Sequence, residues 1–230
     1  MALDLSILLF INRLAHRSLV FDEIVVLASG NNFIKGGIVF AVVWYLWFQK
    51  EDARKKREYL LAGVAASFVG LAVAKALTWT IVRPRPLVVP ELGLRLPYGI
   101  KAVTWEGLSS FPSDHAVLFF ALATGIFFAS RRIGWLVFIY VSVFICLPRL
   151  YIGLHYPSDI LAGAVIGITT GWLLHLPAVG KPLTNWAFRW LEARPGQFYA
   201  FSFLLTYMIC ELFDPLLSIA NFIRRGHLPQ

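Results

Sequence analysis

The sequence has little cysteine and little charge. Its two cysteines, Cys146 and Cys210, both fall inside apolar stretches and lie far apart in the chain. Two such thiols form neither a disulfide framework nor a metal site, so we interpret them as small buried apolar side chains. Charged residues make up only 15% of the chain, and it has no internal repeats or low-complexity segments. These absences exclude a disulfide-rich scaffold and a repeat architecture.

Apolar residues dominate what is present. They form 58% of the 230 residues, and the mean hydropathy is +0.69. A globular domain this apolar would expose patches that it could not keep soluble. The apolar residues also form long runs rather than alternating, as a bilayer requires. We therefore expect a single membrane-embedded domain over residues 1–230. The net charge of +8 lies mostly between the runs, which favours membrane orientation over nucleic-acid binding.

The apolar runs predict an all-α, polytopic transmembrane bundle with five to six spans. Residues 1–30 are apolar but carry several charges, so we expect one or two amphipathic helices at the membrane interface. Residues 31–178 should form the core bundle, and 179–230 a C-terminal loop followed by a weaker span. The expected spans cover residues 33–48, 59–82, 113–130, 133–147, 158–176 and 198–217.

The sixth expected span is the weakest of the set. Glu211, Asp214 and Pro215 interrupt its apolar run. A carboxylate inside the bilayer is a default candidate for function, but these two lie near a helix end, where an interfacial position explains them better. A re-entrant segment over 198–217 is therefore an alternative to a full crossing.

Basic residues cluster in alternate loops between the expected spans. They fall in the segments 50–57, 131–132 and 181–194. The positive-inside rule places these loops in the cytoplasm. The loops 83–112 and 149–157 then lie on the opposite, extracytoplasmic side. We therefore expect a multi-pass protein of the cell membrane.

Three polar segments stand out, and the hydropathy pattern brings all of them to the extracytoplasmic side. The first is Arg83-Pro84-Arg85-Pro86, at the end of the second expected span. The second is Phe111-Pro112-Ser113-Asp114-His115, at the start of the third. The third runs from Arg149 through His155 to Asp159, between the fourth and fifth. Two spans that end and two that begin on one side should let these segments converge.

Several of these residues suit the binding of an anion. Arg85, Arg149 and Arg83 offer planar guanidinium groups that bind phosphate oxygens in pairs. Ser113 follows a proline and suits an N-cap, so the third span would point its N–H groups and positive dipole end toward the site. Pro157 suits the first turn of the fifth span. Two helix N-termini that face one pocket favour phosphate.

Two histidines and a carboxylate add the chemistry. His115 and His155 supply imidazoles, and Asp159 follows His155 by four residues, close enough to accept its ring N–H and fix the tautomer. A nucleophile, an orienting carboxylate, a second imidazole and an arginine clamp are the parts that phosphoryl transfer requires. No acidic cluster or His/Cys spacing suggests a metal, so we expect arginines to neutralise the phosphate and no cofactor to be bound.

Each segment taken alone has a plainer explanation. Arginine and proline at a span end serve as an interfacial anchor and a helix stop. A Pro-Ser-x-His sequence can be a cap followed by an interface histidine. The ordered combination on one face is what favours an active site. Trp105 and Glu106, in the loop before the third span, could line an entrance for lipid.

The three segments resemble the motifs of the type 2 phosphatidic acid phosphatase superfamily. Its pattern is Lys-x6-Arg-Pro, then Pro-Ser-Gly-His, then Ser-Arg-x5-His-x3-Asp. The resemblance covers about residues 75–165 and keeps the spacing of the last motif. It implies a helical bundle with the site near one membrane surface. It also implies that His155 forms a phosphohistidine, that Asp159 orients it, and that His115 protonates the leaving oxygen and then activates water. The resemblance assigns the phosphate to Arg85, Ser113 and Arg149.

Three positions depart from the family pattern. Asp114 replaces the glycine, which is similar to the bacterial undecaprenyl-diphosphate phosphatase branch. Pro148 replaces the serine of the third motif. Thr78 stands where the first motif has lysine, and Lys75 lies one turn earlier. We expect Lys75 to reach the phosphate pocket by extending outward along its helix. In the alternative, Lys75 pairs with another helix and Arg83 supplies the charge.

The sequence thus predicts metal-independent hydrolysis of a lipid phosphate or diphosphate at the extracytoplasmic surface. The leading substrate is undecaprenyl diphosphate, cleaved to undecaprenyl phosphate through a phosphohistidine. The enzymatic alternatives are a phosphatase of phosphatidic acid or phosphatidylglycerophosphate and a lipid A phosphatase. A protein that only binds or flips lipid phosphates is the non-enzymatic alternative. It would need the arginines but no nucleophile, so the histidines argue against it.

Overall fold

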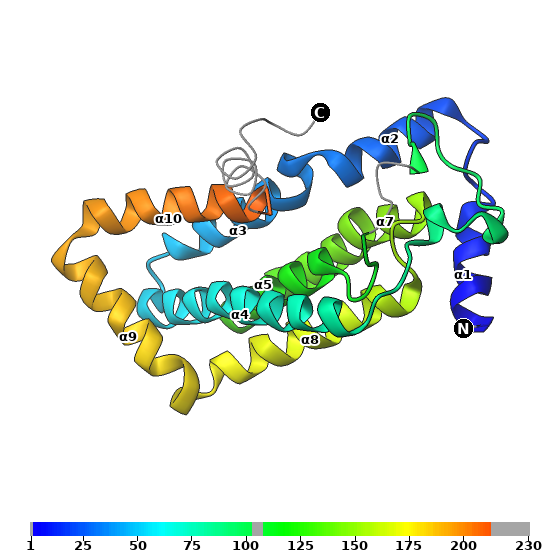
Figure 1. Cartoon of the computed structure of the whole chain (residues 1–230). Helices are drawn as coiled ribbons and strands as arrows, with labels where there is room; N and C mark the ends of the chain where they lie inside the picture. The colour runs from blue at the N-terminus through cyan, green and yellow to red at the C-terminus, as the bar shows by residue number, and fades with distance from the viewer. Residues whose placement is uncertain (1, 103–107, 213–230) are drawn as a thin grey trace, which may run out of the picture.

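The computed structural model of the protein describes residues 2–102 and 108–212, and within them the all-α prediction is confirmed. Figure 1 shows α4, α5 and α8 side by side, with α3 and α10 along one flank, α9 at one end and α1 at the other. The helices are, in chain order, α1 (Ala2–Asn12), α2 (Leu19–Gly30), η1 (Phe33–Gly37), α3 (Ile38–Trp47), α4 (Ala53–Thr80), η2 (Pro86–Val88), η3 (Pro90–Leu92), α5 (Asp114–Ala129), α6 (Arg131–Tyr140), η5 (Val141–Cys146), α7 (Leu147–Ile152), α8 (Pro157–His175), α9 (Pro177–Ala193) and α10 (Pro195–Cys210).

Helix α5 is the centre of the bundle. Its sequence is apolar on every side, and such a helix is stable only when it is surrounded by other elements. Glycines let its neighbours approach closely. A Cβ at Gly167 of α8 would lie 2.3 Å from the Val117 carbonyl oxygen, and one at Gly63 of α4 would lie 2.9 Å from the Cα of Gly125. Small residues at helix crossings are typical of membrane bundles. These contacts set how closely α4 and α8 pack against α5.

Three helices are long and apolar enough to cross a membrane, and a bent pair makes up to four, among the described residues. The three are α4, the run Arg131–Ile152 and α8. The bent pair joins Leu19–Gly30 to Phe33–Trp47 at 63°. Several apolar helices of this kind indicate an integral, multi-pass membrane protein. The count is lower than the five to six spans of the prediction.

The shortfall has a physical reason at α5. It has 16 residues, which at 1.5 Å each give about 24 Å, less than the roughly 30 Å of a bilayer core. Because other helices surround it, its ends need not reach the lipid headgroups. Helix α10 also has 16 residues, and the second half of the sixth expected span, with Asp214 and Pro215, lies outside the described residues. Glu211 accepts a hydrogen bond from the Asn32 side chain at 2.6 Å.

The prediction of a loop after the fifth span was wrong, because α9 occupies most of it. Gly180, Thr184, Ala187 and Phe188 are its buried residues, spaced along one face of a helix as an amphipathic pattern requires. The basic and polar residues on the other face gave the segment the composition of a loop. In the N-terminal segment, where one or two helices were expected, the chain forms α1 and α2.

Aromatic side chains join α10 and α9 to α3. The Phe198 ring stacks on Trp47 at 5.8 Å between centroids and meets Trp190 edge-on at 5.5 Å. Trp47 also donates its indole N–H to the Tyr199 hydroxyl at 3.3 Å. We call Trp44, Trp47, Trp190, Phe198 and Tyr199 the aromatic cluster. It holds the C-terminal helices against the first half of the chain.

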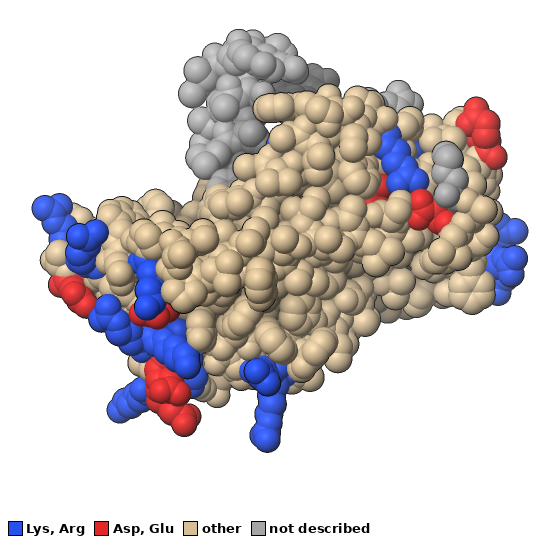
Figure 2. All heavy atoms as spheres, turned by 90° about the horizontal axis from the view of Figure 1, so that it is seen from below, with Lys and Arg blue, Asp and Glu red and all other residues tan. Residues whose placement is uncertain are grey.

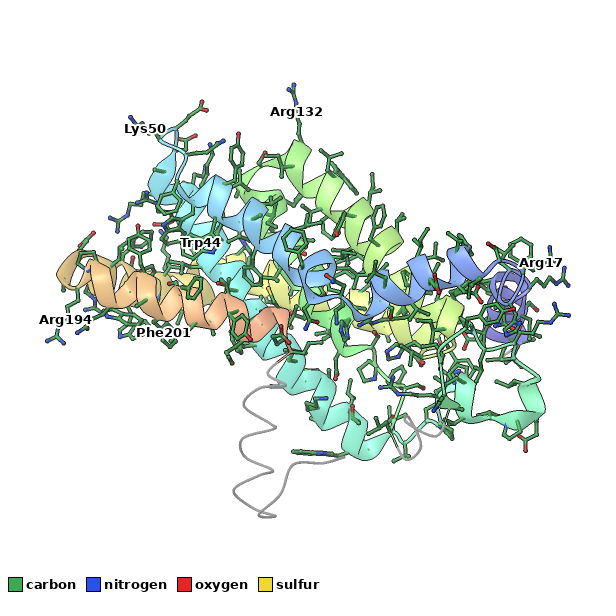
Figure 3. All side chains as sticks on the ribbon, turned by 90° about the horizontal axis from the view of Figure 1, so that it is seen from above. Arg17, Trp44, Lys50, Arg132, Arg194 and Phe201 are labelled. Atoms are coloured by element: carbon green, nitrogen blue, oxygen red, sulfur yellow. The ribbon has the colours of Figure 1, made fainter. Side chains whose placement is uncertain are left out.

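Charged residues gather at the two ends of the molecule, with an uncharged belt between them on the face drawn in Figure 2. Lys50 and Arg194 lie at one end and Arg17 at the other (Figure 3). Residues at the start of α4 line one cavity together with Arg131 and another together with Lys181. The basic loops that the positive-inside rule grouped together therefore do share one end of the bundle.

Candidate active site

The three polar segments converge on one cavity of about 260 Å³ at the end of the bundle opposite the basic loops. Five of the eight residues assigned to the site from the sequence line it, namely Lys75, Arg85, His115, Arg149 and His155. The other lining residues are Thr78, Leu108, Ser109, Pro112, Asp114 and Leu154. Ser113, Arg83 and Asp159 lie behind this surface.

His155 lies in the short loop between α7 and α8. Gly153 ends α7 with a positive φ of 82°, and the backbone N–H of Leu154 returns to the Arg149 carbonyl at 2.9 Å. The Nδ1 atom of His155 is 2.8 Å from the Ser110 carbonyl oxygen. Because a carbonyl can only accept, Nδ1 carries the proton and Nε2 keeps its lone pair. The loop thus presents a neutral imidazole of fixed tautomer.

The electrostatics favour that neutral form. Burial, reinforced by the charges of Arg85 and Arg149, lowers the pKa of His155 to about 3. An ordinary histidine has a pKa of about 6.5. His155 is therefore unprotonated throughout the physiological range and can act as a nucleophile without first losing a proton.

Asp159 does not hold His155 directly, in contrast to the expected hydrogen bond. The distance from Nδ1 to its Oδ2 is 3.9 Å, too long for a hydrogen bond. The buried carboxylate instead accepts the Tyr156 backbone N–H at 2.7 Å and the Arg83 guanidinium at 2.6 Å. Asp159 is the third residue of α8, where a carboxylate folds back to cap the helix. It positions the loop that carries His155, while Ser110 fixes the ring.

Arg83 does not line the cavity, in contrast to its assignment from the sequence. Its guanidinium lies over the Tyr156 ring at 3.7 Å. It donates to Asp159 at 2.6 Å, to Ser158 at 2.7 Å and to Asp4 at 3.0 Å. Two carboxylates thus hold Arg83 behind the site.

Sequence reasoning missed Asp4 of α1. Its carboxylate accepts the backbone N–H of Ser158 at 2.9 Å and the Ser158 hydroxyl at 2.7 Å, in addition to Arg83. Asp4 therefore caps α8 from a distant part of the chain. Its only signal in the sequence is an acidic residue before an apolar run, which an interfacial helix explains equally well. The role of Ser110 could not be found from the sequence either, because it is the backbone carbonyl and not the side chain that contacts His155.

The two arginines of the cavity come from different elements. Arg149 is buried on α7, and its Nη1 donates to the Ser29 hydroxyl at 3.2 Å. Arg85 directly precedes η2. Partial burial lowers the pKa of Arg85, and the charges of Asp114 and Asp159 oppose that change. An arginine stays protonated after such a decrease, so the cavity holds two guanidinium cations.

His115 and Ser113 both belong to the start of α5. Ser113 is the N-cap, as the sequence indicated, and accepts the Ala116 backbone N–H at 3.5 Å. Its fully buried hydroxyl does not line the cavity. The Nε2 atom of His115 has no hydrogen-bond partner among the described residues. A buried imidazole nitrogen with no partner costs free energy unless a ligand satisfies it.

Lys75 lines the cavity from α4 and also pairs with another helix. Its Nζ lies 2.6 Å from the Asp114 carboxylate on α5, and Thr78 lies beside it on the lining. Lys75 thus lies at the pocket, as the first alternative expected, and pairs with another helix, as the second did, but Arg83, which the second alternative also required, does not line the cavity. Contact of Lys75 with phosphate stays a prediction. Trp105 and Glu106, suggested for a lipid entrance, lie outside the described residues.

The arrangement can accept a tetrahedral anion. Two guanidinium groups, a lysine and two imidazoles, of which that of His155 is neutral, line the same cavity. Within the described residues no group of three His, Cys, Asp or Glu side chains is placed to hold a metal ion. The expected independence from metal stays a prediction to be tested.

The profile of the PAP2 superfamily matches residues 58–178, more than half of the chain. The chain belongs to the PAP2 superfamily. The match covers every cavity residue, whereas α1, α2 and α3 lie outside it. Membership makes the protein a phosphatase, a hydrolase that acts on lipid phosphates, rather than a protein that only binds or flips them.

Individual members of the superfamily differ in their sequence identity to this chain and in how much of it they cover. Undecaprenyl-diphosphatase BcrC of Bacillus subtilis is 27% identical over 163 residues, which cover 71% of this chain and 78% of that protein. Lipid A 4'-phosphatase of Bacteroides thetaiotaomicron is 44% identical over 75 residues, or 30% and 31% of the two chains. The crystal structure of Aquifex aeolicus LpxE is 27% identical with a TM-score of 0.51, and the alignment covers 75% of this chain and 94% of that one.

Proposed function

We propose that the protein hydrolyses undecaprenyl diphosphate to undecaprenyl phosphate at the extracytoplasmic membrane surface. The observation that supports the chemistry is the cavity in which His155, His115, Arg85 and Arg149 meet. The observation that favours this substrate is the extent of similarity. The aligned region covers 78% of an undecaprenyl-diphosphatase. The alignment with a lipid A phosphatase has a higher identity but covers only 31% of that protein.

The proposed reaction has two steps. Arg85 and Arg149 bind oxygens of the terminal phosphate, with Lys75 beside them, and Nε2 of His155 attacks its phosphorus. The bond to the bridging oxygen breaks as the N–P bond forms, and His115 donates a proton to the departing lipid phosphate. His115 then takes a proton from water, whose oxygen attacks the phosphohistidine. This step releases inorganic phosphate and restores the imidazole.

A lipid A phosphatase is the second candidate, because the chain is 44% identical to such an enzyme over 75 residues. Phosphatidic acid and phosphatidylglycerophosphate remain enzymatic alternatives on chemical grounds, since each also presents a phosphate monoester to the cavity. All three predict the same site chemistry and differ in the lipid.

Phosphate release from a panel of these lipids tests the proposal. We expect undecaprenyl diphosphate to give the highest kcat/KM, with activity retained in EDTA and inhibited by vanadate, which mimics five-coordinate phosphorus. His155→Ala should lose more than about 10³-fold in kcat, since the nucleophile is deleted. His16→Asn is the matched control, because His16 is exposed with a φ of 64° that asparagine tolerates.

Separate outcomes would refute separate parts of this proposal. A well-folded His155→Ala enzyme that keeps several per cent of its activity would exclude His155 as the nucleophile. A strict requirement for magnesium would exclude the metal-independent mechanism. A higher kcat/KM for lipid A or phosphatidic acid would leave the chemistry in place and replace the substrate.

A further inference from the structure

Two cavities meet at the end of the bundle opposite the active site. The first has a volume of about 300 Å³ and is lined by the start of α4 and the turn between α5 and α6. The second is an apolar groove of about 880 Å³ between α6 and α8, with α5 as its floor. Phe127 and Phe128 line both. A single molecule can therefore occupy the two at once.

The smaller cavity is basic. Lys55, Lys56 and Arg131 line it, against the single carboxylate of Asp52 among its described lining residues. Lys56 donates to the Gln49 side chain at 2.9 Å, whereas Lys55 and Arg131 are exposed. At about 30 Å³ per water molecule, the cavity has room for roughly ten waters. We call it the basic pocket, and its charge suits a phosphate group.

The larger cavity suits hydrocarbon. Its lining is aromatic and aliphatic, and its few polar side-chain atoms are hydroxyls of serine and threonine and the indole N–H groups of two tryptophans. The hydroxyls of Thr124 and Ser142 are already bonded to the carbonyls of their own helices. The groove residues are Phe120, Thr124, Phe127, Phe128, Trp135, Phe138, Ile139, Ser142, Val143, Ile168, Thr169 and Trp172.

Two tryptophans place the groove in the bilayer. Trp135 is the fifth residue of α6, and Trp172 lies in the last turn of α8. They are 61% and 53% exposed, and both line the groove. Exposed tryptophan in a membrane protein prefers the headgroup level. Both tryptophans lie at the helix ends nearest the basic pocket, so that pocket lies at the headgroup level and the groove extends from it into the hydrocarbon.

We infer that the basic pocket and the groove together form a binding site for one anionic phospholipid. The lipid phosphate lies between Lys55 and Arg131, and an acyl chain extends past Phe127 and Phe128 along the groove. The charge of the pocket selects an anionic headgroup over a zwitterionic one. The inference does not depend on the proposed substrate, because the site lies at the other end of the bundle and shares no residue with the catalytic cavity.

Lipid binding to the purified full-length protein, measured by native mass spectrometry, tests this inference. Phosphatidylglycerol and phosphatidylcholine with the same acyl chains are titrated separately, and the Kd of the first bound lipid is compared. We expect phosphatidylglycerol to bind at least tenfold more tightly. Glycerol 3-phosphate at millimolar concentration should not displace it, because the groove supplies part of the affinity.

Matched double variants separate the site from general surface charge. Lys55→Gln with Arg131→Gln should weaken phosphatidylglycerol binding by about 25-fold, at about fivefold per basic residue. Lys50→Gln with Arg132→Gln removes the same charge at the same end of the bundle, from exposed residues that do not line the pocket (Figure 3). This pair should change the Kd less than twofold.

A separate substitution tests whether the groove contributes to lipid binding. Val143→Trp fills it and should weaken the binding of both lipids, while a normal elution volume in size-exclusion chromatography reports an intact fold. Equal affinity for the two lipids would overturn the inference. So would equal effects of the two double variants, or full displacement by glycerol 3-phosphate.

Discussion

At the scale of single residues, the largest differences from the sequence prediction concern the residues that hold His155 in place rather than the residues that line the cavity. The motif spacing suggests that Asp159 orients His155, but the Ser110 carbonyl makes that hydrogen bond. Asp159 instead forms a buried ion pair with Arg83. A buried carboxylate that loses the cation paired with it is strongly destabilising, more so than the loss of both partners. The role of Arg83 can therefore be tested through Asp159.

Arg83→Gln should lower kcat by about 10- to 100-fold and leave KM within about threefold. Arg83 does not line the cavity, so its removal should displace the His155 loop without weakening phosphate binding. Adding Asp159→Asn in the same chain should restore part of kcat, because the fully buried charge is then removed together with its partner and only the less buried Asp4 carboxylate is left without Arg83. Steady-state kinetics of the two single variants and the double variant measure this coupling. Additive losses, or a large rise in KM for Arg83→Gln alone, would contradict it.

The cavity residues themselves could be found from the sequence. Hydropathy placed Arg85, His115, Arg149 and His155 at the ends of expected spans. Because successive spans cross in opposite directions, these ends lie on one side, and the residues were therefore expected to converge. The contribution of Asp4 could not be found in this way, because its partners are about 80 and 154 residues away. Contacts of that range depend on packing between helices, which no local pattern encodes.

At the scale of elements, the position of the site depends on how closely α8 crosses α5. Both helices begin at the cavity, and the glycines of α8 set their separation. The helices of the core could be predicted because apolar runs are a strong signal. Helix α9 could not, because a helix that buries only one face can have the polar composition of a loop.

Gly167→Ala should reduce both stability and activity. The new methyl group would lie 2.3 Å from the Val117 carbonyl oxygen, which belongs to the backbone and cannot rotate away. We expect the Tm to fall by several degrees and kcat by about tenfold, because the start of α8 moves with the crossing. Gly196→Ala is the matched control, since a Cβ there meets nothing within 4 Å. Equal Tm values for the two variants would show that the crossing tolerates a wider spacing.

At the scale of the whole molecule, the uncharged belt and the two charged ends define an axis across the bilayer. The cavity lies at one end and the basic loops at the other. The number of crossing helices was the least predictable feature. A helix enclosed by others, such as α5, does not need the length that lipid would impose.

Labelling of single cysteines in intact cells tests the direction of that axis. Glu91→Cys in η3 lies at the cavity end, and Lys50→Cys lies between α3 and α4 at the other; both positions are exposed. With Cys146 and Cys210 replaced by alanine, an impermeant maleimide should label Glu91→Cys and not Lys50→Cys. Permeabilised cells provide the control, in which both should react. The reverse pattern in intact cells would place the active site in the cytoplasm.

The aromatic cluster gives the molecule an optical property of its own. Three of its eight tryptophans, Trp44, Trp47 and Trp190, belong to the cluster, whereas the catalytic cavity contains none among its described residues. The emission of these three tryptophans therefore reports on whether α9 and α10 remain docked on α3, while the other five lie outside the cluster. Ligands and substitutions at the cavity should leave the emission maximum nearly unchanged. A red shift that precedes the loss of phosphatase activity on heating would mean that the C-terminal helices detach while the catalytic helices stay assembled.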